Sequence, residues 1–180
     1  MTEAWMRVRR MLLGAFGGLY HDLIGSRSPL GAAAVILDAD DRVFLVQHSY
    51  GRRNWELPGG GRKANESMEQ TVHRELREET GVEVVIERLS GVYYQPHIDH
   101  HHFVFLCHVT PGSQASANSP EILTCGYWPI TALPRPISDF TLLRIDDARV
   151  GRPFTSIAVV GRRQWIDDPA AWLRERRDRG

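Results

Sequence analysis

Three glutamates, Glu75, Glu78 and Glu79, fall within five positions of the chain. Residues three and four apart on a helix lie on one face, so the three carboxylates would point the same way. Like charges at this spacing cost about 0.2–0.5 kcal/mol per pair even on an exposed helix, and a bound cation would offset that cost. Oxygen ligands at this density suit a hard divalent cation such as Mg²⁺ or Mn²⁺. The spacing therefore predicts a metal-binding helix face.

The elements that would position these carboxylates are predicted by local signals. Ser67 followed by Gln70 fits a capping box at the start of a helix, and Gly81 lies where a left-handed C-cap belongs. An apolar stripe at helical spacing lies between the caps, formed by Met68, Val72 and Leu76. A run of three glycines, residues 59–61, precedes the helix. The pattern predicts a glycine turn that leads into a helix with an acidic face.

Residues 60–82 resemble the Nudix box, GX5EX7REUXEEXGU, in which U is a bulky aliphatic residue. Every specified position is matched, by Gly60, Glu66, Arg74, Glu75, Leu76, Glu78, Glu79, Gly81 and Val82. Residues 55–60, WELPGG, also look like the usual approach to that box. A complete match at fixed spacing is far more specific than a short glycine motif, and it argues against a merely solvated acidic face.

The resemblance implies an α/β fold, the Nudix-type α/β/α sandwich with a mixed β-sheet. It implies a set of ligands for Mg²⁺ or Mn²⁺, namely Glu75, Glu78, Glu79 and the carbonyl of Gly59. Glu78 or Glu79 would double as the catalytic base, and Arg74 would serve catalysis by pairing with Glu66 to support the loop. The implied reaction is metal-dependent hydrolysis of a nucleoside diphosphate linked to another moiety.

Electrostatics supports this reaction independently of the resemblance. A diphosphate and a glutamate cluster are both anionic, so a divalent cation must bridge them. Such a cation polarises phosphoryl oxygens and lowers the pKa of a bound water, which can then attack phosphorus in line. The sequence therefore predicts a small-molecule diphosphate as the substrate.

A second candidate for the catalytic base lies outside the box. In many proteins with this box the base is on a later loop, and Glu121 directly precedes a strand expected over residues 122–130. The alternative interpretation of Glu121 is a solvated loop carboxylate, the usual state of a glutamate. Both interpretations are open at this stage.

Substrate contacts are predicted at two further places. Arg52 and Arg53 precede Trp55 and would clamp a phosphate, because guanidinium suits bidentate contact with it; otherwise they are exposed loop arginines. Residues 97–102, HIDHHH, form a polar loop, an active-site lip or a metal site. On a strand, His100 and His102 would share a face and touch the substrate. A zinc site would need further ligands, and none lies nearby at the usual spacing.

Composition restricts the class of protein. The 180 residues are 42% hydrophobic and 24% charged with zero net charge, which is typical of one globular domain and gives no basic excess for nucleic acid. Cys107 and Cys125 do not make a disulfide framework, so we expect a reducing, cytoplasmic location. No apolar run approaches the roughly 18 residues of a membrane span.

Three regions are expected along the chain. Residues 1–28 would form an N-terminal amphipathic helix and linker, with the helix packed on the domain, in a homodimer interface, or on a membrane surface. Residues 29–155 would form the Nudix domain, which opens with a hairpin of two strands at residues 31–38 and 42–48. Residues 156–180 would add a strand and a short helix packed on that domain.

The substrate is less determined than the reaction. ADP-ribose hydrolases of this family often show a proline some distance downstream of the box, and Pro96 lies close to that position, which favours ADP-ribose or a related nucleotide sugar. The first alternative is a house-cleaning hydrolase of modified nucleoside triphosphates. A prenyl or other lipid-like diphosphate is another alternative, in view of the basic-apolar N-terminal helix. A nucleotide sensor that binds without hydrolysis is the alternative from a different functional class.

Overall fold

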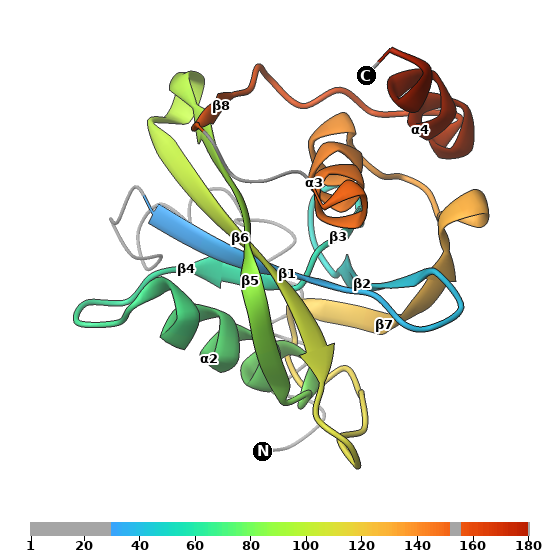
Figure 1. Ribbon diagram of the computed structural model, residues 1–180. Coiled ribbons are helices and arrows are strands. Elements are labelled where there is room, and N and C mark those ends of the chain that lie inside the picture. The colour runs from blue at the N-terminus through green and yellow to red at the C-terminus, as the bar shows by residue number, and fades with distance from the viewer. Residues whose placement is uncertain (1–29, 152–155, 180) are drawn as a thin grey trace.

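The computed structural model describes residues 30–151 and 156–179, which form two sheets with helices on either side (Figure 1). The strands are β1 Leu30–Ile36, β2 Arg42–His48, β3 Trp55–Glu56, β4 Gly59–Gly61, β5 Val84–Gln95, β6 His100–Val109, β7 Ile122–Pro129 and β8 Ala158–Val159. The helices are α2 Met68–Thr80, α3 Asp139–Val150 and α4 Pro169–Asp178, with short 3-10 turns at Pro96–Ile98 and Ile130–Ala132. The larger sheet has the order β4-β1-β6-β5-β8 and the smaller one β3-β2-β7.

Strand β1 is buried on both faces and divides the core in two. Its residues Ala33 and Val35 pack in the cluster that contains Phe140 and Ile145 of α3. Its other residues, Ala32, Ala34 and Ile36, pack in the cluster that contains Val72 and Leu76 of α2. Because side chains alternate along a strand, α2 and α3 cover opposite faces of the five-stranded sheet. This is the predicted α/β/α sandwich with a mixed sheet.

The predicted hairpin of residues 31–38 and 42–48 is wrong. Both strands exist, but β1 pairs in parallel with β6 and β2 pairs antiparallel with β7, so the two belong to different sheets. Only the isolated bridge between Leu37 and Val43 joins them. An apolar run predicts a buried strand, but it does not specify which strand pairs with it.

The helix caps were predicted correctly. Ser67 Oγ accepts from the Gln70 amide at 3.1 Å, and the Gln70 side chain accepts from the Ser67 amide at 2.7 Å. Gly81 closes α2 in the left-handed region, at φ 70°. Each pairing satisfies amide or carbonyl groups that a helix end leaves free. The capping box therefore fixes where α2 begins, and so the direction in which its acidic face points.

The histidine run does not form a loop. His100, His101 and His102 are the first residues of β6, and a 3-10 turn at Pro96–Ile98 joins them to β5. β5 is continuous through two irregularities in its pairing with β6. A run of polar histidines gives no apolar alternation, so the sequence did not show that β6 begins at His100.

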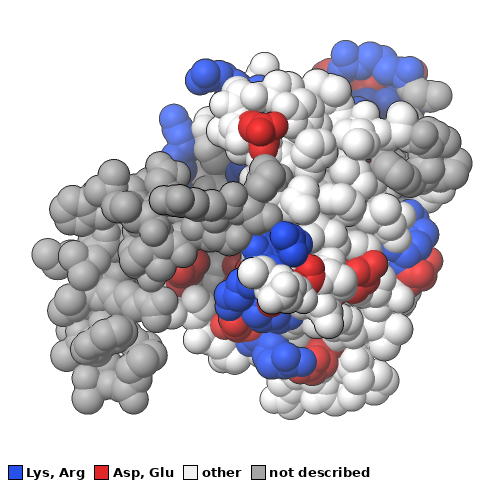
Figure 2. Space-filling view, turned by 90° about the vertical axis from the view of Figure 1, so that its left-hand side faces the viewer, with Lys and Arg blue, Asp and Glu red and all other residues white. Residues whose placement is uncertain are grey.

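The predicted N-terminal helix lies outside the described residues, and the predicted domain boundaries and homodimer stay predictions. In the described ranges, no helix is both long and apolar enough to cross a membrane. On the face shown in Figure 2, acidic and basic side chains lie intermixed.

Candidate active site

The three glycines predicted as a turn form the edge strand β4 of the large sheet, and this segment is called the glycine turn below. β4 pairs antiparallel with β1, with Gly59 opposite Ala33 and Gly60 opposite Ala32. Gly59 has φ 154°, and a Cβ there would lie 2.3 Å from the Ala32 carbonyl oxygen. A Cβ on Gly60 would lie 2.5 Å from Glu75 Oε1 on α2. Only residues without side chains let the turn fit between the β1 backbone and the acidic face of α2.

Glu79 is the most buried of the three glutamates, at 8% exposed. Its Oε2 accepts a hydrogen bond from the Gly59 amide at 3.0 Å, which attaches the helix to the glycine turn. Burial raises the pKa of the Glu79 carboxyl well above its usual range, and the Glu75 carboxylate raises it further. Water solvates a carboxylate poorly in this buried position, so a bound cation would strongly stabilise its charged form.

Glu75 and Glu78 bind cationic side chains. Arg74 Nη1 lies 2.7 Å from Glu75 Oε1 and 3.1 Å from Glu78 Oε2, and Lys63 Nζ lies 3.1 Å from Glu78 Oε1. Burial raises the pKa of Glu75, although Arg74 opposes that effect. Glu78 is half exposed. Two of the three carboxylates thus contact positive groups on the protein itself.

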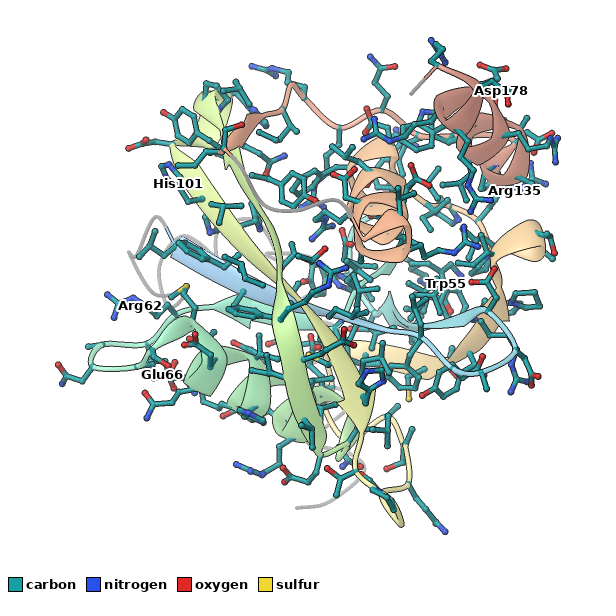
Figure 3. The ribbon with its side chains drawn as sticks, viewed as in Figure 1. Trp55, Arg62, Glu66, His101, Arg135 and Asp178 are labelled. Carbon is teal, nitrogen blue, oxygen red and sulfur yellow. The ribbon has the colours of Figure 1, made fainter. Side chains whose placement is uncertain are left out.

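The predicted pair of Glu66 and Arg74 is confirmed, and it is bidentate. Arg74 Nε lies 2.6 Å from Glu66 Oε1, and its Nη2 lies 3.0 Å from Glu66 Oε2. The Arg74 hydrogen bond lowers the pKa of Glu66 to about 2. Arg74 Nη2 also donates to the Gly61 carbonyl at 2.9 Å, so one guanidinium ties β4, the loop and α2 together. Figure 3 shows Glu66 at the loop that leads into α2.

The chemistry of this donor set fits a hard divalent cation, because it consists of carboxylate and carbonyl oxygens. Two of the carboxyl groups, those of Glu75 and Glu79, have pKa values raised by burial, and a cation between them would reverse that effect. Within residues 30–151 and 156–179, no three His, Cys, Asp or Glu side chains converge as a metal site. Lys63 and Arg74 draw Glu78 and Glu75 toward themselves instead.

Glu121 lies close to Glu79, as a second base would have to. The loop before it is bound to the end of α2, since the Ser116 and Asn118 amides donate to the carbonyls of Thr80 and Glu79 at 2.9 Å each. The Ser49 amide then binds the Glu121 carbonyl at 2.7 Å. Glu121 is near enough to contribute to the raised pKa of Glu79. Its role as a base stays a prediction.

The two loop arginines have different surroundings. The Arg52 guanidinium lies over the ring of Trp165 in the C-terminal tail, 5.2 Å from the ring centre. Arg53 has φ 52°, and its carbonyl accepts from the Gln47 side chain at 3.1 Å. The structure thus places Arg52 against the tail and Arg53 in a tight turn. Phosphate binding by either side chain stays a prediction.

His100 and His102 share a face of β6, as expected for a strand, and their rings stack with centres 4.2 Å apart. His102 binds the Gln95 side chain at 3.0 Å and meets Phe140 of α3 edge-on. Burial lowers the pKa of His102 to about 2, so its ring is neutral. A Cβ on Gly31 would lie 2.9 Å from His100 Nε2. The pair therefore lies on the α3 side of the sheet.

Sequence reasoning missed a buried ion cluster beside the glycine turn. Glu56 is 7% exposed and Arg144 of α3 is 2% exposed, and their Oε1 and Nη2 atoms lie 2.5 Å apart. Thr141 Oγ1 donates to the same Glu56 oxygen at 2.9 Å, and Arg163 Nη1 lies 3.2 Å from the other. Burial alone would raise the pKa of Glu56, but Arg144 and Arg163 lower it. The only local signal was Glu56 itself, in the approach to the box.

Comparison with known proteins places the chain in a family. The model of the NUDIX domain family matches residues 27–147. A Bacillus subtilis (strain 168) protein named, provisionally, as an 8-oxo-dGTP diphosphatase is 31% identical over 121 residues, which cover 61% of this chain and 78% of that protein. An ADP-ribose pyrophosphatase of Methanocaldococcus jannaschii is 34% identical over 77 residues, covering 39% of this chain and 43% of that protein. The crystal structure of a NUDIX hydrolase from Nitrosomonas europaea has a TM-score of 0.64 at 20% identity, covering 74% of this chain and 78% of that one.

The chain therefore belongs to the Nudix family. It is a Nudix hydrolase, and hydrolases of this family generally use divalent metal ions. The likeness to the Nitrosomonas europaea structure shows the fold, which is the predicted class. The relatives differ in the substrate that their names state, so the family establishes the reaction class and leaves the substrate to be proposed.

Replacing Gly59 by alanine is expected to lower the free energy of unfolding by about 3 kcal/mol, because φ 154° strains an L-residue and the new Cβ meets backbone atoms of Ala32 and Ala33. Urea unfolding measures the change. Gly112→Ala is the matched control: φ there is 86° with nothing within 4 Å of the Cβ, so only about 1 kcal/mol of strain is expected. Equal losses in the two variants would contradict the close fit at Gly59.

Proposed function

We propose that the chain is a Mg²⁺-dependent hydrolase, also served by Mn²⁺, that cleaves the diphosphate bond of a nucleoside diphosphate linked to another moiety, such as ADP-ribose or a nucleotide sugar. One observation carries the proposal. The buried Glu79 is held by the Gly59 amide at 3.0 Å and stands next to Glu75, and burial raises the pKa of both carboxyl groups. Arg74 and the Gly59 amide stabilise the charged forms of these carboxyl groups in part, and a bound cation would stabilise them further.

In this proposal the metal ligands are Glu75, Glu78, Glu79 and the Gly59 carbonyl. When bound, the metal supplies positive charge that offsets the diphosphate charge and makes water more acidic. Glu121 accepts the proton of the attacking water on a carboxylate oxygen, with Glu78 or Glu79 as the alternative base. The water oxygen bonds to one phosphorus as the bond from that phosphorus to the bridging oxygen breaks. Arg74, held by Glu66, keeps the glycine turn and α2 in register throughout.

A second substrate class is favoured by a specific observation. The Bacillus subtilis relative, matched over 78% of its length, is named for 8-oxo-dGTP. A modified nucleoside triphosphate presents the same diphosphate linkage to the same carboxylates, so the described site suits both classes. Base and sugar contacts decide between them, and these would come from side chains around the ends of β2 and β6.

The test is a substrate panel with the purified full chain: ADP-ribose, a UDP-sugar, 8-oxo-dGTP, dGTP and a prenyl diphosphate, each with Mg²⁺, with Mn²⁺ and with EDTA. We expect a nucleoside monophosphate among the products of ADP-ribose and no turnover with EDTA. Preferred release of 8-oxo-dGMP and pyrophosphate would favour the second class instead. Tight binding of a nucleotide without release of any product would overturn the enzyme proposal in favour of a sensor.

A further inference from the structure

The C-terminal tail is fastened to the start of α3 by backbone hydrogen bonds. The Asp139 amide donates to the Gln164 carbonyl at 2.9 Å, and the Gln164 amide donates to Asp139 Oδ1 at 2.8 Å. The Ile166 amide donates to the Ile137 carbonyl at 3.1 Å. Gln164 and Ile166 follow the range that the family model matches, which ends at residue 147. The tail therefore holds a fixed position beside the site, although it is not part of the family pattern.

Because the tail is attached in this way, Arg163 contacts the buried ion cluster and is also exposed to solvent. Its Nη1 lies 3.2 Å from Glu56 Oε2, and its guanidinium lies over the Phe140 ring at 5.3 Å. The side chain is 35% exposed, whereas its partner Glu56 is buried. Across the two described ranges, Nε and Nη2 of Arg163 bind no acceptor. Those donors are available to a further group.

The charges of the cluster do not balance. Glu56 is already paired with the buried Arg144 at 2.5 Å, so Arg163 is a second guanidinium on a single carboxylate. The neighbouring His102 adds no charge to the cluster, since burial lowers its pKa to about 2 and its ring is neutral. Two guanidiniums around one carboxylate leave an excess positive charge, which an anion would offset. Guanidinium prefers phosphate for this purpose, because its planar fork matches two phosphate oxygens.

Arg163 is joined to the glycine turn through its partner Glu56, which stands three residues before Gly59. Tyr50 lies on the loop after β2, next to Ser49, whose amide donates to the Glu121 carbonyl at 2.7 Å. Burial raises the pKa of the Tyr50 hydroxyl, the Glu121 and Glu79 carboxylates raise it further, and Arg163 lowers it. Glu56, the partner of Arg163, also stands directly before the Leu57-Pro58-Gly59 approach to the turn.

We infer that Arg163 is a substrate-binding residue, contributed by the C-terminal tail, that donates to phosphate oxygens of the substrate. The inference rests on the proposed function for the identity of the ligand, a phosphorylated nucleoside. The inference gives the C-terminal tail a role in substrate binding. A tail that only packed on the domain would have no such role.

The kinetic test compares Arg163→Met with the parent chain on the substrate that the panel identifies. We expect KM to rise about 10- to 100-fold, as for loss of a charged hydrogen-bonding partner, with kcat changed less than about threefold. Arg163→Lys should recover part of the loss, because it restores charge without the fork. Arg162→Met is the matched control, an exposed neighbouring arginine, and should leave KM unchanged. An Arg163→Met variant with unaltered KM and a lowered melting temperature would reduce Arg163 to a structural role and overturn the inference.

A binding experiment separates this inference from the proposed function. Titration calorimetry with ADP and with adenosine, both with Mg²⁺, requires no turnover. We expect Arg163→Met to weaken ADP binding about tenfold or more and to leave adenosine binding unchanged. That result supports the role of Arg163 even if the parent hydrolyses nothing in the panel. Equal ADP affinity in Arg163→Met and the parent overturns the inference, even if hydrolysis is confirmed.

Discussion

Replacing Glu79 by glutamine is expected to lower kcat/KM by about 10³-fold or more, a loss of about 4 kcal/mol in transition-state stabilisation. Glutamine keeps the acceptor for the Gly59 amide but removes the charge that a divalent cation requires. Stability should stay the same or rise, because the buried carboxyl group is costly to ionise, as its raised pKa indicates. Steady-state kinetics with Mg²⁺ and thermal unfolding measure the two effects on one preparation.

Glu69→Gln is the matched control for Glu79→Gln. Glu69 lies on the same helix but is exposed, so its substitution should change neither activity nor stability measurably. Calorimetric titration of Mn²⁺ into both variants adds a readout that does not depend on turnover, and only Glu79→Gln should lose affinity. Near-normal activity of Glu79→Gln would remove Glu79 from the set of metal ligands.

Arg144→Met is expected to cost about 3–5 kcal/mol of folding free energy, because it leaves the carboxylate of Glu56 buried with only the partly exposed Arg163 as a charged partner. Methionine preserves much of the side-chain volume, so the loss reports the charge rather than a cavity. Chemical unfolding in urea measures it. We also expect activity to fall, since Glu56 directly precedes the approach to the glycine turn.

Two further variants show whether the stability lost in Arg144→Met comes from the buried charge. Arg42→Met removes an arginine from an exposed pair with Asp38, in which the arginine side chain is 45% exposed, and should cost less than about 1 kcal/mol. The double variant Glu56→Leu with Arg144→Met removes both buried charges and should recover most of the stability lost by Arg144→Met alone. A loss below about 1 kcal/mol for Arg144→Met would show that the pair contributes little.

The parts of the fold that could be predicted from the sequence are those with local causes. Ser67, Gln70 and Gly81 fix both ends of α2 through contacts within four residues of each cap. The acidic face and its support by Glu66 and Arg74 follow from helical spacing together with a motif whose positions are all close in sequence. Local interactions of this kind form whatever the rest of the fold is, so they can be predicted from the sequence alone.

The parts that could not be predicted depend on contacts between distant residues. Glu56 meets Arg144 across 88 positions and Arg163 across 107, and neither arginine stands in a pattern that indicates a partner. The same reason explains the wrong hairpin, since β1 finds its partner in β6 rather than in the adjacent strand. His102 became interpretable only when Gln95 and Phe140 were placed beside it.

The separation of β1 and β2 into different sheets has a consequence for how the chain folds. Ala34 pairs with Phe105, and Leu45 pairs with Gly126, so the central strands of both sheets close loops of about 70 to 80 residues. Closing a loop costs conformational entropy before the contacts between its ends form and offset that cost. Folding therefore slows as the average sequence separation of contacts rises. During synthesis, the buried apolar strand β1 must therefore wait, unpaired along its central edge, until residues beyond 100 have left the ribosome. The Nudix box is complete some twenty residues before that strand, so until β6 arrives its glycine turn has only β1 as a partner in the sheet.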